Sequence, residues 1–332
     1  MSVASPEPNN AKGLAWILCS IFAASVMSVA VRELSFTLDS RMIVLLRAGL
    51  TTALLIPALL LVPRLRRQLR FSRPGLHILR GALIGVSTHL GFYALAHLPL
   101  ATASVLFFTA PIFATLLTGP VQGERVGPRR WAAVCAGFAG ALIILRPTAE
   151  GWDAGMLAAL GSSLLFACAL LLSRRIAEAD GPTAAYTSSV VLTVLITLPV
   201  MDGAWALPEG WGRWAVVAAL LIGGTVRGYS DIEAYRHGEA SILGPITYLR
   251  LVILGYAGYV LYGERIAAPT VAGAPLILGA ALYIARREAR CAQKRRRARN
   301  AAASVPSSRE SISPPTGTPC ASEVISNPDP SN

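Results

Sequence analysis

Long apolar stretches alternate with short polar connections along most of the chain. Between residues 13 and 286, about ten of these stretches are long enough, at roughly 20 residues each, to cross a bilayer as helices. The pattern therefore predicts an all-α integral membrane protein. The predicted helices cover residues 13–31, 42–62, 75–97, 101–121, 129–146, 154–174, 183–201, 212–235, 239–262 and 268–286.

The composition agrees with lipid as the main solvent. Of the 332 residues, 54% are hydrophobic and only 14% are charged, and the mean hydropathy is +0.54. A soluble domain of this length could not bury so much apolar surface. The predicted helices and their short connections use residues 13–286 almost entirely and leave no room for a soluble catalytic domain. The net charge of +12 comes from arginines in short loops and one tail, so it indicates membrane orientation and no nucleic-acid partner.

Arginines occur in every second connection. The connections 63–73 and 122–130 are rich in arginine, whereas 147–153 and 202–211 carry carboxylates and neither Lys nor Arg. Because positively charged loops stay in the cytoplasm, we expect both termini to be cytoplasmic. The first apolar stretch has no small-residue cleavage site after it, so we interpret it as a retained helix. The sequence thus predicts a multi-pass protein of the cell inner membrane.

Two segments of the chain resemble each other. Residues 93–130 and 235–269 each end a helix with Tyr, continue through Ala-Ser into an apolar helix with an early proline, and finish with Gly-Glu-Arg. The prolines are Pro111 and Pro245. An odd number of helices in each half would place the second copy upside down relative to the first, as in many secondary transporters. The predicted units are a disordered N-terminus at 1–12, five-helix repeats at 13–150 and 151–287, and a basic, then disordered, cytoplasmic tail at 288–332.

These motifs resemble those of the EamA-type permeases of the drug/metabolite transporter superfamily. The resemblance rests on the doubled Gly-Glu-Arg, on FFTAPIFATLL at 107–117 and on FAGALIILRP at 138–147, and it covers residues 13–286. It implies a ten-helix secondary carrier that works by alternating access, with a central cavity between the halves and no metal or organic cofactor. We expect the cavity between the third, fourth, eighth and ninth predicted helices.

Charged residues inside the predicted helices are candidates for a binding site. Arg227 and Asp231 are one helical turn apart, Arg250 lies near the middle of its helix, and Arg47 lies about a turn into another. An unpaired charge at this depth costs several kcal/mol, so each should face a partner or water. Either Arg227 and Asp231 only satisfy each other while Arg47 extends toward the membrane surface, or an arginine contacts an anionic or carbonyl-rich part of a substrate.

A histidine, several aromatic residues and the two prolines complete the predicted site. His89 lies within an apolar helix, where it either packs through a hydrogen bond or relays a coupled proton. The aromatic rings either pack in the core or stack on a flat solute. A proline frees a backbone carbonyl, which bends a helix or exposes a polar group to a cavity. The predicted substrate-binding residues are Arg47, His89, Tyr93, Phe107, Phe108, Pro111, Arg227, Tyr229, Asp231, Pro245, Tyr248 and Arg250.

The function that these features favour is secondary transport of a small organic metabolite. Within that class the aromatic residues favour a flavin such as riboflavin or another heteroaromatic solute. An amino-acid or metabolite exporter and an S-adenosylmethionine-type cofactor uptake carrier are alternatives. A membrane-embedded enzyme or a non-transporting sensor are alternatives of another class. The expected partners are the small-molecule substrate, the lipid bilayer and a coupled proton, and the sequence leaves open the transport direction and whether the unit is a monomer or a homodimer.

Overall fold

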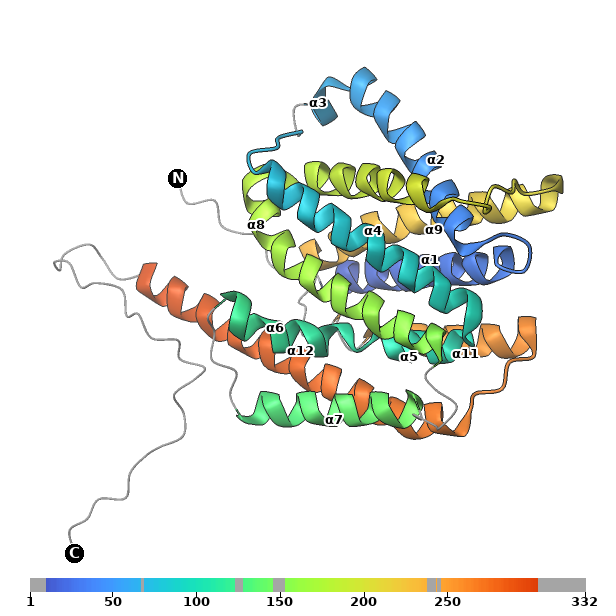
Figure 1. Ribbon diagram of the computed structural model, residues 1–332. Coiled ribbons are helices and arrows are strands. Elements are labelled where there is room, and N and C mark those ends of the chain that lie inside the picture. The colour runs from blue at the N-terminus through green and yellow to red at the C-terminus, as the bar shows by residue number, and fades with distance from the viewer. Residues whose placement is uncertain are drawn as a thin grey trace, which may run out of the picture.

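The structure, a computed structural model, describes residues 10–66, 69–122, 128–145, 153–237, 243 and 246–303. Every regular element in these residues is a helix (Figure 1), so the all-helical prediction is confirmed. Several features discussed above lie outside the described residues, namely Pro245, the first Gly-Glu-Arg copy at 123–125 and the end of the tail at 304–332.

The helices of the first half begin and end close to the predicted positions. The side chain of Asp39 accepts a hydrogen bond of 2.8 Å from the Arg41 backbone N–H, which satisfies a free donor at the start of its helix. Pro74 occupies the first helical position of α4, where a missing N–H costs nothing. The elements are α1 (Asn10–Leu34), α2 (Ser40–Leu61), α3 (Pro63–Arg66), α4 (Pro74–His97), α5 (Leu100–Phe107), α6 (Ala110–Gln122) and α7 (Pro128–Leu145).

The fourth predicted helix is two helices in the structure. Pro111 lacks an N–H and cannot donate to the carbonyl one turn earlier. The chain tightens there: the N–H groups of Phe108 and Thr109 donate three residues back, each over 3.0 Å, and the Thr109 hydroxyl donates to the Leu106 carbonyl over 2.6 Å. The proline predicted a bend in the helix over 101–121, and in the structure the bend is a break: α6 begins at Ala110. Residues 100–117 still form one apolar stretch long enough to cross a membrane.

The second half begins with a long element that bends. Asp153 accepts a hydrogen bond of 2.9 Å from the Met156 N–H at its start. Gly181 then adopts a φ of 83°, a left-handed conformation that glycine tolerates, and the two limbs run in different directions on either side of it (Figure 1). The elements are α8 (Ala154–Thr197), η1 (Leu198–Val200), α9 (Gly210–His237), α11 (Leu249–Tyr262) and α12 (Ala268–Ala303).

Seven helical stretches in the described part of the chain are long and apolar enough to cross a membrane. They lie in α1, α2, α4, α5–α6, both limbs of α8, and α12. Two shorter apolar helices cover 131–145 and 249–262. The last helix continues to Ala303, past the predicted end at 286, because basic residues after the apolar segment are good helix formers and do not end a helix.

Three pairs of helices make the most extensive contacts: α4 with α8, α1 with α9, and α7 with α12. Glycines let these helices approach closely, as expected where lipid gives no hydrophobic drive between helices. Gly81 and Gly85 of α4 face the second limb of α8, near Leu192 and Thr193. Glycines also lie where α7 meets α12: a Cβ added at Gly273 would lie 2.5 Å from the Gly140 carbonyl oxygen.

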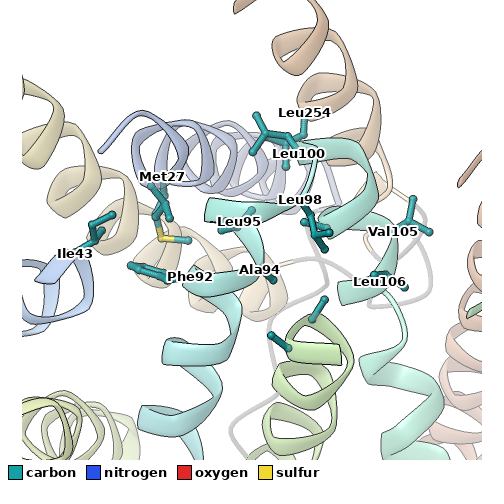
Figure 2. Close-up of a cluster of buried hydrophobic side chains, with 14 of the residues drawn as sticks. Met27, Ile43, Phe92, Ala94, Leu95, Leu98, Leu100, Val105, Leu106 and Leu254 are labelled. Atoms are coloured by element: carbon teal, nitrogen blue, oxygen red, sulfur yellow. The ribbon is translucent and has the colours of Figure 1, made fainter. Parts of the chain in front are cut away.

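A buried apolar cluster lies where α1, α2, α4, α5 and α11 meet (Figure 2). Phe92 belongs to this cluster, and its ring also contacts Arg47 of the polar site described below. Its labelled members are Met27, Ile43, Phe92, Ala94, Leu95, Leu98, Leu100, Val105, Leu106 and Leu254. The cluster connects helices of both halves of the chain.

We predict that Gly273→Ala destabilises the protein by about 1–3 kcal/mol, because the new methyl group would overlap the α7 backbone and force α7 and α12 apart. Gly279→Ala on the same helix is the matched control, because no atom lies within 4 Å of a Cβ there. The thermal unfolding midpoint in detergent measures both. A midpoint for Gly273→Ala equal to that of the control would contradict the close contact.

Candidate functional site

A cavity of about 400 Å³ lies between α2, α4 and both limbs of α8. Each helix contributes residues at helical spacing, such as Arg80, Ile84 and Thr88 of α4, so one face of each helix forms the wall. This location differs from the expected one between the third, fourth, eighth and ninth predicted helices. The lining residues are Val44, Arg47, Ala48, Thr51, Arg80, Ile84, Thr88, Ser173, Ala185, Tyr186, Ser189, Val190 and Thr193.

Arg80 extends from α4 toward α8 and is held there by neutral acceptors. Its Nε donates to the Ser173 hydroxyl over 2.7 Å, and one Nη donates to the Ser189 hydroxyl over 2.7 Å and to the Ala185 carbonyl over 2.9 Å. These three acceptors carry no formal charge, so they orient the guanidinium without neutralising it. The positive charge of Arg80 is therefore available to a ligand in the cavity.

Arg47 contributes a second guanidinium to the same cavity. It lies over the Phe92 ring, 5.6 Å from the ring centre, a cation–π distance. Gly224 of α9 leaves room for it, because a Cβ at that position would come within 3.2 Å of Arg47 Nε. Arg47 therefore points into the bundle, and the alternative that it extends outward to the membrane surface is wrong for this structure.

A polar cluster from α1, α9 and α11 extends the site beyond Arg47. Arg227 and Asp231 form the ion pair that their spacing predicted, at 3.8 Å, and Asp231 also accepts a hydrogen bond from Ser20. Arg250 donates to the Ser28 hydroxyl over 2.8 Å. In the described part of the chain its buried Nε–H has no hydrogen-bond partner. Arg250 thus keeps a donor for a ligand, since an unsatisfied buried donor is costly.

Electrostatic interactions connect these arginines. Arg227 interacts with Arg47 on one side and with Arg250 on the other, and Asp231 also interacts with Arg250. The site is therefore rich in positive charge.

The other predicted site residues make packing contacts. His89 Nε2 lies 2.8 Å from the hydroxyl of Thr197, and Tyr93 stacks on the exposed His97 with ring centres 4.0 Å apart. Tyr229 is 59% exposed and meets Trp16 edge to face, with ring centres 5.6 Å apart. None of these side chains lines the cavity described above.

The predicted residues around the helix break also lie apart from the cavity. Phe108 and Tyr248 come from different halves of the chain and pack with ring centres 4.7 Å apart. Phe107 packs against the buried cluster. The Pro111 carbonyl accepts a hydrogen bond of 2.9 Å from the Thr115 hydroxyl. Of the described residues predicted for the site, the structure brings Arg47, Arg227, Asp231 and Arg250 together.

Sequence reasoning missed Arg80, although the signal was present. Arg80 is a charged residue within the predicted helix 75–97, and the same rule that selected Arg47 applies to it. It also missed the buried pair of His77 and Asp180, whose nearest side-chain atoms are 3.0 Å apart. The hydroxyl of Ser72 donates to Asp180 and is the main reason that the pKa of this carboxyl is lowered to about 2. No sequence spacing indicates a contact between residues 103 positions apart.

The second Gly-Glu-Arg copy connects helix ends on one side of the bundle. Gly263 ends α11 with a φ of 63°, a left-handed cap. Glu264 can then accept a hydrogen bond of 2.8 Å from the Leu100 N–H at the start of α5 and form an ion pair of 3.3 Å with Arg32 of α1. A carboxylate is favourable at a helix N-terminus, so the motif connects the ends of α1, α5 and α11.

Within the described residues, no group of three or more His, Cys, Asp or Glu side chains is placed to hold a metal ion. A profile of the EamA-like transporter family matches residues 11–146 and again 153–286. The chain belongs to the EamA-like transporter family. The two matches cover the two similar halves seen in the sequence and confirm the resemblance.

Two similar proteins and one solved structure are informative. The chain is 27% identical to an S-adenosylmethionine uptake transporter of Rickettsia felis, with 82% of this chain and 92% of the relative covered. It is 28% identical to a riboflavin transporter of Vibrio cholerae, with 88% and 97% covered. A crystal structure at 21% identity superposes with a TM-score of 0.58 over 85% of this chain and 99% of the other, which shows the same fold.

We predict that Asp231→Asn lowers the amount of folded protein in the membrane, because it leaves Arg227 unpaired at a cost of about 2.5–3.5 kcal/mol. The double variant Arg227→Gln/Asp231→Asn should recover most of the loss, since both charges are then absent. Fluorescence-detected size-exclusion chromatography measures the folded fraction. A double variant no more abundant than Asp231→Asn alone would show that the ion pair is not the cause.

Proposed function

We propose that this EamA-like transporter is a secondary carrier of ten transmembrane helices, built as inverted five-helix repeats at 13–150 and 151–287. The two family matches and the paired motifs support this arrangement. The shorter apolar helices at 131–145 and 249–262 and the less apolar α9 would complete the count. In this arrangement both termini are cytoplasmic in the inner membrane, and the basic extension of α12 lies at the cytoplasmic surface.

Two halves related by a two-fold axis would make matching helix contacts. If each helix of the first half corresponds to the one five places later, α4 against the first limb of α8 corresponds to α9 against α1. The pair of α7 and α12 corresponds to itself. The most extensive contacts in the structure are those of α4 with α8 taken as a whole, α1 with α9, and α7 with α12. This set supports a two-fold relation between the halves and alternating access by their relative movement.

We further propose that the substrate is an uncharged or anionic heteroaromatic metabolite with several carbonyl groups, of which riboflavin is the type. The observation that carries this proposal is the pair of arginines that line one cavity, Arg47 and Arg80. Guanidinium groups donate to carbonyl oxygens and stack on flat rings. The partly exposed Tyr186 and the hydroxyls of Thr88, Ser189 and Thr193 in the wall suit a ring system that carries a polyol chain.

The positive charge of the cavity favours riboflavin over S-adenosylmethionine as the substrate. The latter is a net cation because of its sulfonium and ammonium groups, and a cation beside Arg47 and Arg80 would be repelled. Amino-acid export is a further alternative, since a carboxylate would also suit these arginines. The second class of alternatives, a membrane-embedded enzyme or a sensor, would bind such a molecule without moving it.

The test is flux into liposomes that contain the purified protein. We predict uptake of riboflavin, followed by its fluorescence, and no competition by a tenfold excess of S-adenosylmethionine. Arg47→Gln should raise the apparent KM about 10- to 100-fold, since hydrogen bonds to charged groups contribute about 1.5–3 kcal/mol. The control is Arg213→Gln, an exposed arginine whose ion pair with Glu209 lies at the protein surface.

Three outcomes would contradict the proposal. Uptake of S-adenosylmethionine in place of riboflavin would show that the arginines do not select the substrate. Binding of riboflavin without flux would favour a sensor. An equal KM in Arg47→Gln and Arg213→Gln would show that Arg47 does not contact the substrate.

A further inference from the structure

A buried histidine connects the start of α4 to the bend of α8. His77 Nε2 lies 3.0 Å from Asp180 Oδ2, and its Nδ1 lies 3.0 Å from the hydroxyl oxygen of Ser188. The side chains of His77 and Asp180 are 3% and 0% exposed. The other Asp180 oxygen accepts from the N–H of Ser72 over 3.0 Å and from the Ser72 hydroxyl. The imidazole is thus fixed on both nitrogens and shielded from water.

The partners of His77 fit both of its charge states. When the imidazole is neutral, Nε2–H donates to Asp180 and Nδ1 accepts from the Ser188 hydroxyl. When it is protonated, Nδ1–H donates to the same Ser188 oxygen, and the hydroxyl turns to the Ala185 carbonyl, which lies 3.1 Å away. A proton can therefore be bound or released with every polar atom of this group satisfied and no heavy atom displaced.

The same carbonyl connects the histidine to the cavity. The Ala185 oxygen accepts from Arg80 Nη1 over 2.9 Å, and Arg80 lines the cavity wall. When His77 is neutral, this carbonyl accepts from Arg80 over 2.9 Å and from the Ser189 hydroxyl over 2.8 Å. When His77 is protonated, the Ser188 hydroxyl joins them as a further side-chain donor over 3.1 Å, and the hold of α8 on the guanidinium weakens. The proton on His77 and the freedom of Arg80 to bind substrate are thus coupled through two hydrogen bonds.

The surroundings contain few other charges. Among the described side chains, Asp180 faces the imidazole from the bend of α8, and Arg80 stands one turn further along α4. The segment before α4 presents Phe71, whose ring meets His77 edge to face at 5.0 Å, and Ser72. Asp180 directly precedes Gly181, the residue at which α8 bends. Protonation turns the hydrogen bond from a neutral imidazole to the Asp180 carboxylate into an ion pair at that bend, which changes how firmly α4 holds the two limbs.

We propose that His77, held by Asp180 and Ser188, is the proton-binding site that couples substrate movement through the α2, α4 and α8 cavity to a pH gradient. The proposal rests on the carrier function proposed above and adds its coupling ion. The proposal assigns the proton to His77 and not to His89, the histidine expected from the sequence. His89 contacts Thr197, which has no carboxylate. Coupling requires that the proton and the substrate favour different states of the α4–α8 contact, and the shared Ala185 carbonyl supplies that difference.

The experiment is riboflavin flux in proteoliposomes with and without an imposed pH difference. A gradient of one unit, a tenfold proton ratio, should change the initial rate of the wild-type protein by about fivefold to tenfold. His77→Gln keeps an amide for hydrogen bonding but cannot take up a proton, so it should exchange riboflavin at equal pH and lose the response to the gradient. His89→Gln is the matched control and should keep the response. A gradient response in His77→Gln, or none in the wild-type protein, would overturn the proposal.

A second measurement does not depend on the substrate. Proton binding at His77 should make the thermal midpoint of the purified wild-type protein depend on pH. His77→Gln should lose this part of the dependence, and His97→Gln should retain it. Absence of riboflavin flux at every pH would refute the carrier proposal, while equal pH dependence in wild-type and His77→Gln proteins would refute the proton site independently.

Discussion

Hydrocarbon offers no hydrogen bond to a backbone group or to a charge, and this constraint determines where the polar residues of the chain stand. Hydroxyls inside the helices donate to carbonyls one turn earlier, as Ser28 does to Ala24 over 3.0 Å. The arginines of the spans point into the bundle, toward hydroxyls, an aromatic face or one aspartate. Each polar or charged residue within an apolar helix therefore lies either at a contact between helices or at a place that water or substrate reaches.

The contacts that Arg32 makes with Ala96 and Glu264 and the cavity lie toward opposite ends of α4. At its C-terminal end, Arg32 donates to the Ala96 carbonyl and pairs with Glu264, and this joins α1, α4, α5 and α11. Near its N-terminal end, Arg80 stands in the cavity wall. A carrier that alternates between two states needs one end held while the other is accessible. The second Gly-Glu-Arg copy accounts for the held end, because Gly263 turns the chain and Glu264 makes the connections.

The sequence predicted the helices well because each must present an apolar length of similar size to the lipid. The predicted 75–97 and the observed Pro74–His97 of α4 are an example. Pro111 predicted a bend in the fourth helix, and the structure has a break there, between α5 and α6. The form of the bend was not predicted, since a proline in the first turn of a helix and a proline within a continuous helix look alike in the sequence. The extension of α12 was missed because apolarity marks the membrane and not the helix.

The site was predicted less completely, for a physical reason. A charged residue within a membrane helix is costly, so its position in the sequence alone marks it as a candidate site residue. This rule selects Arg47, Arg227 and Arg250, and it also applies to Arg80. The partners of a charge depend on helix packing, which single positions do not contain. The contact of His77 with Asp180 arises only because α4 packs along both limbs of α8, and the aromatic residues expected at the cavity pack elsewhere for the same reason.

The account depends most on the claim that substrate occupies the cavity between α2, α4 and α8. Thr193 lines that cavity, so a single cysteine placed there, in a protein freed of its native cysteines, reports on it directly. Saturating riboflavin should slow the reaction of Thr193→Cys with a small water-soluble thiol reagent and leave the loop variant Gly203→Cys unaffected. Equal reaction rates of Thr193→Cys with and without riboflavin, in a protein that transports it, would place the substrate elsewhere and contradict the account.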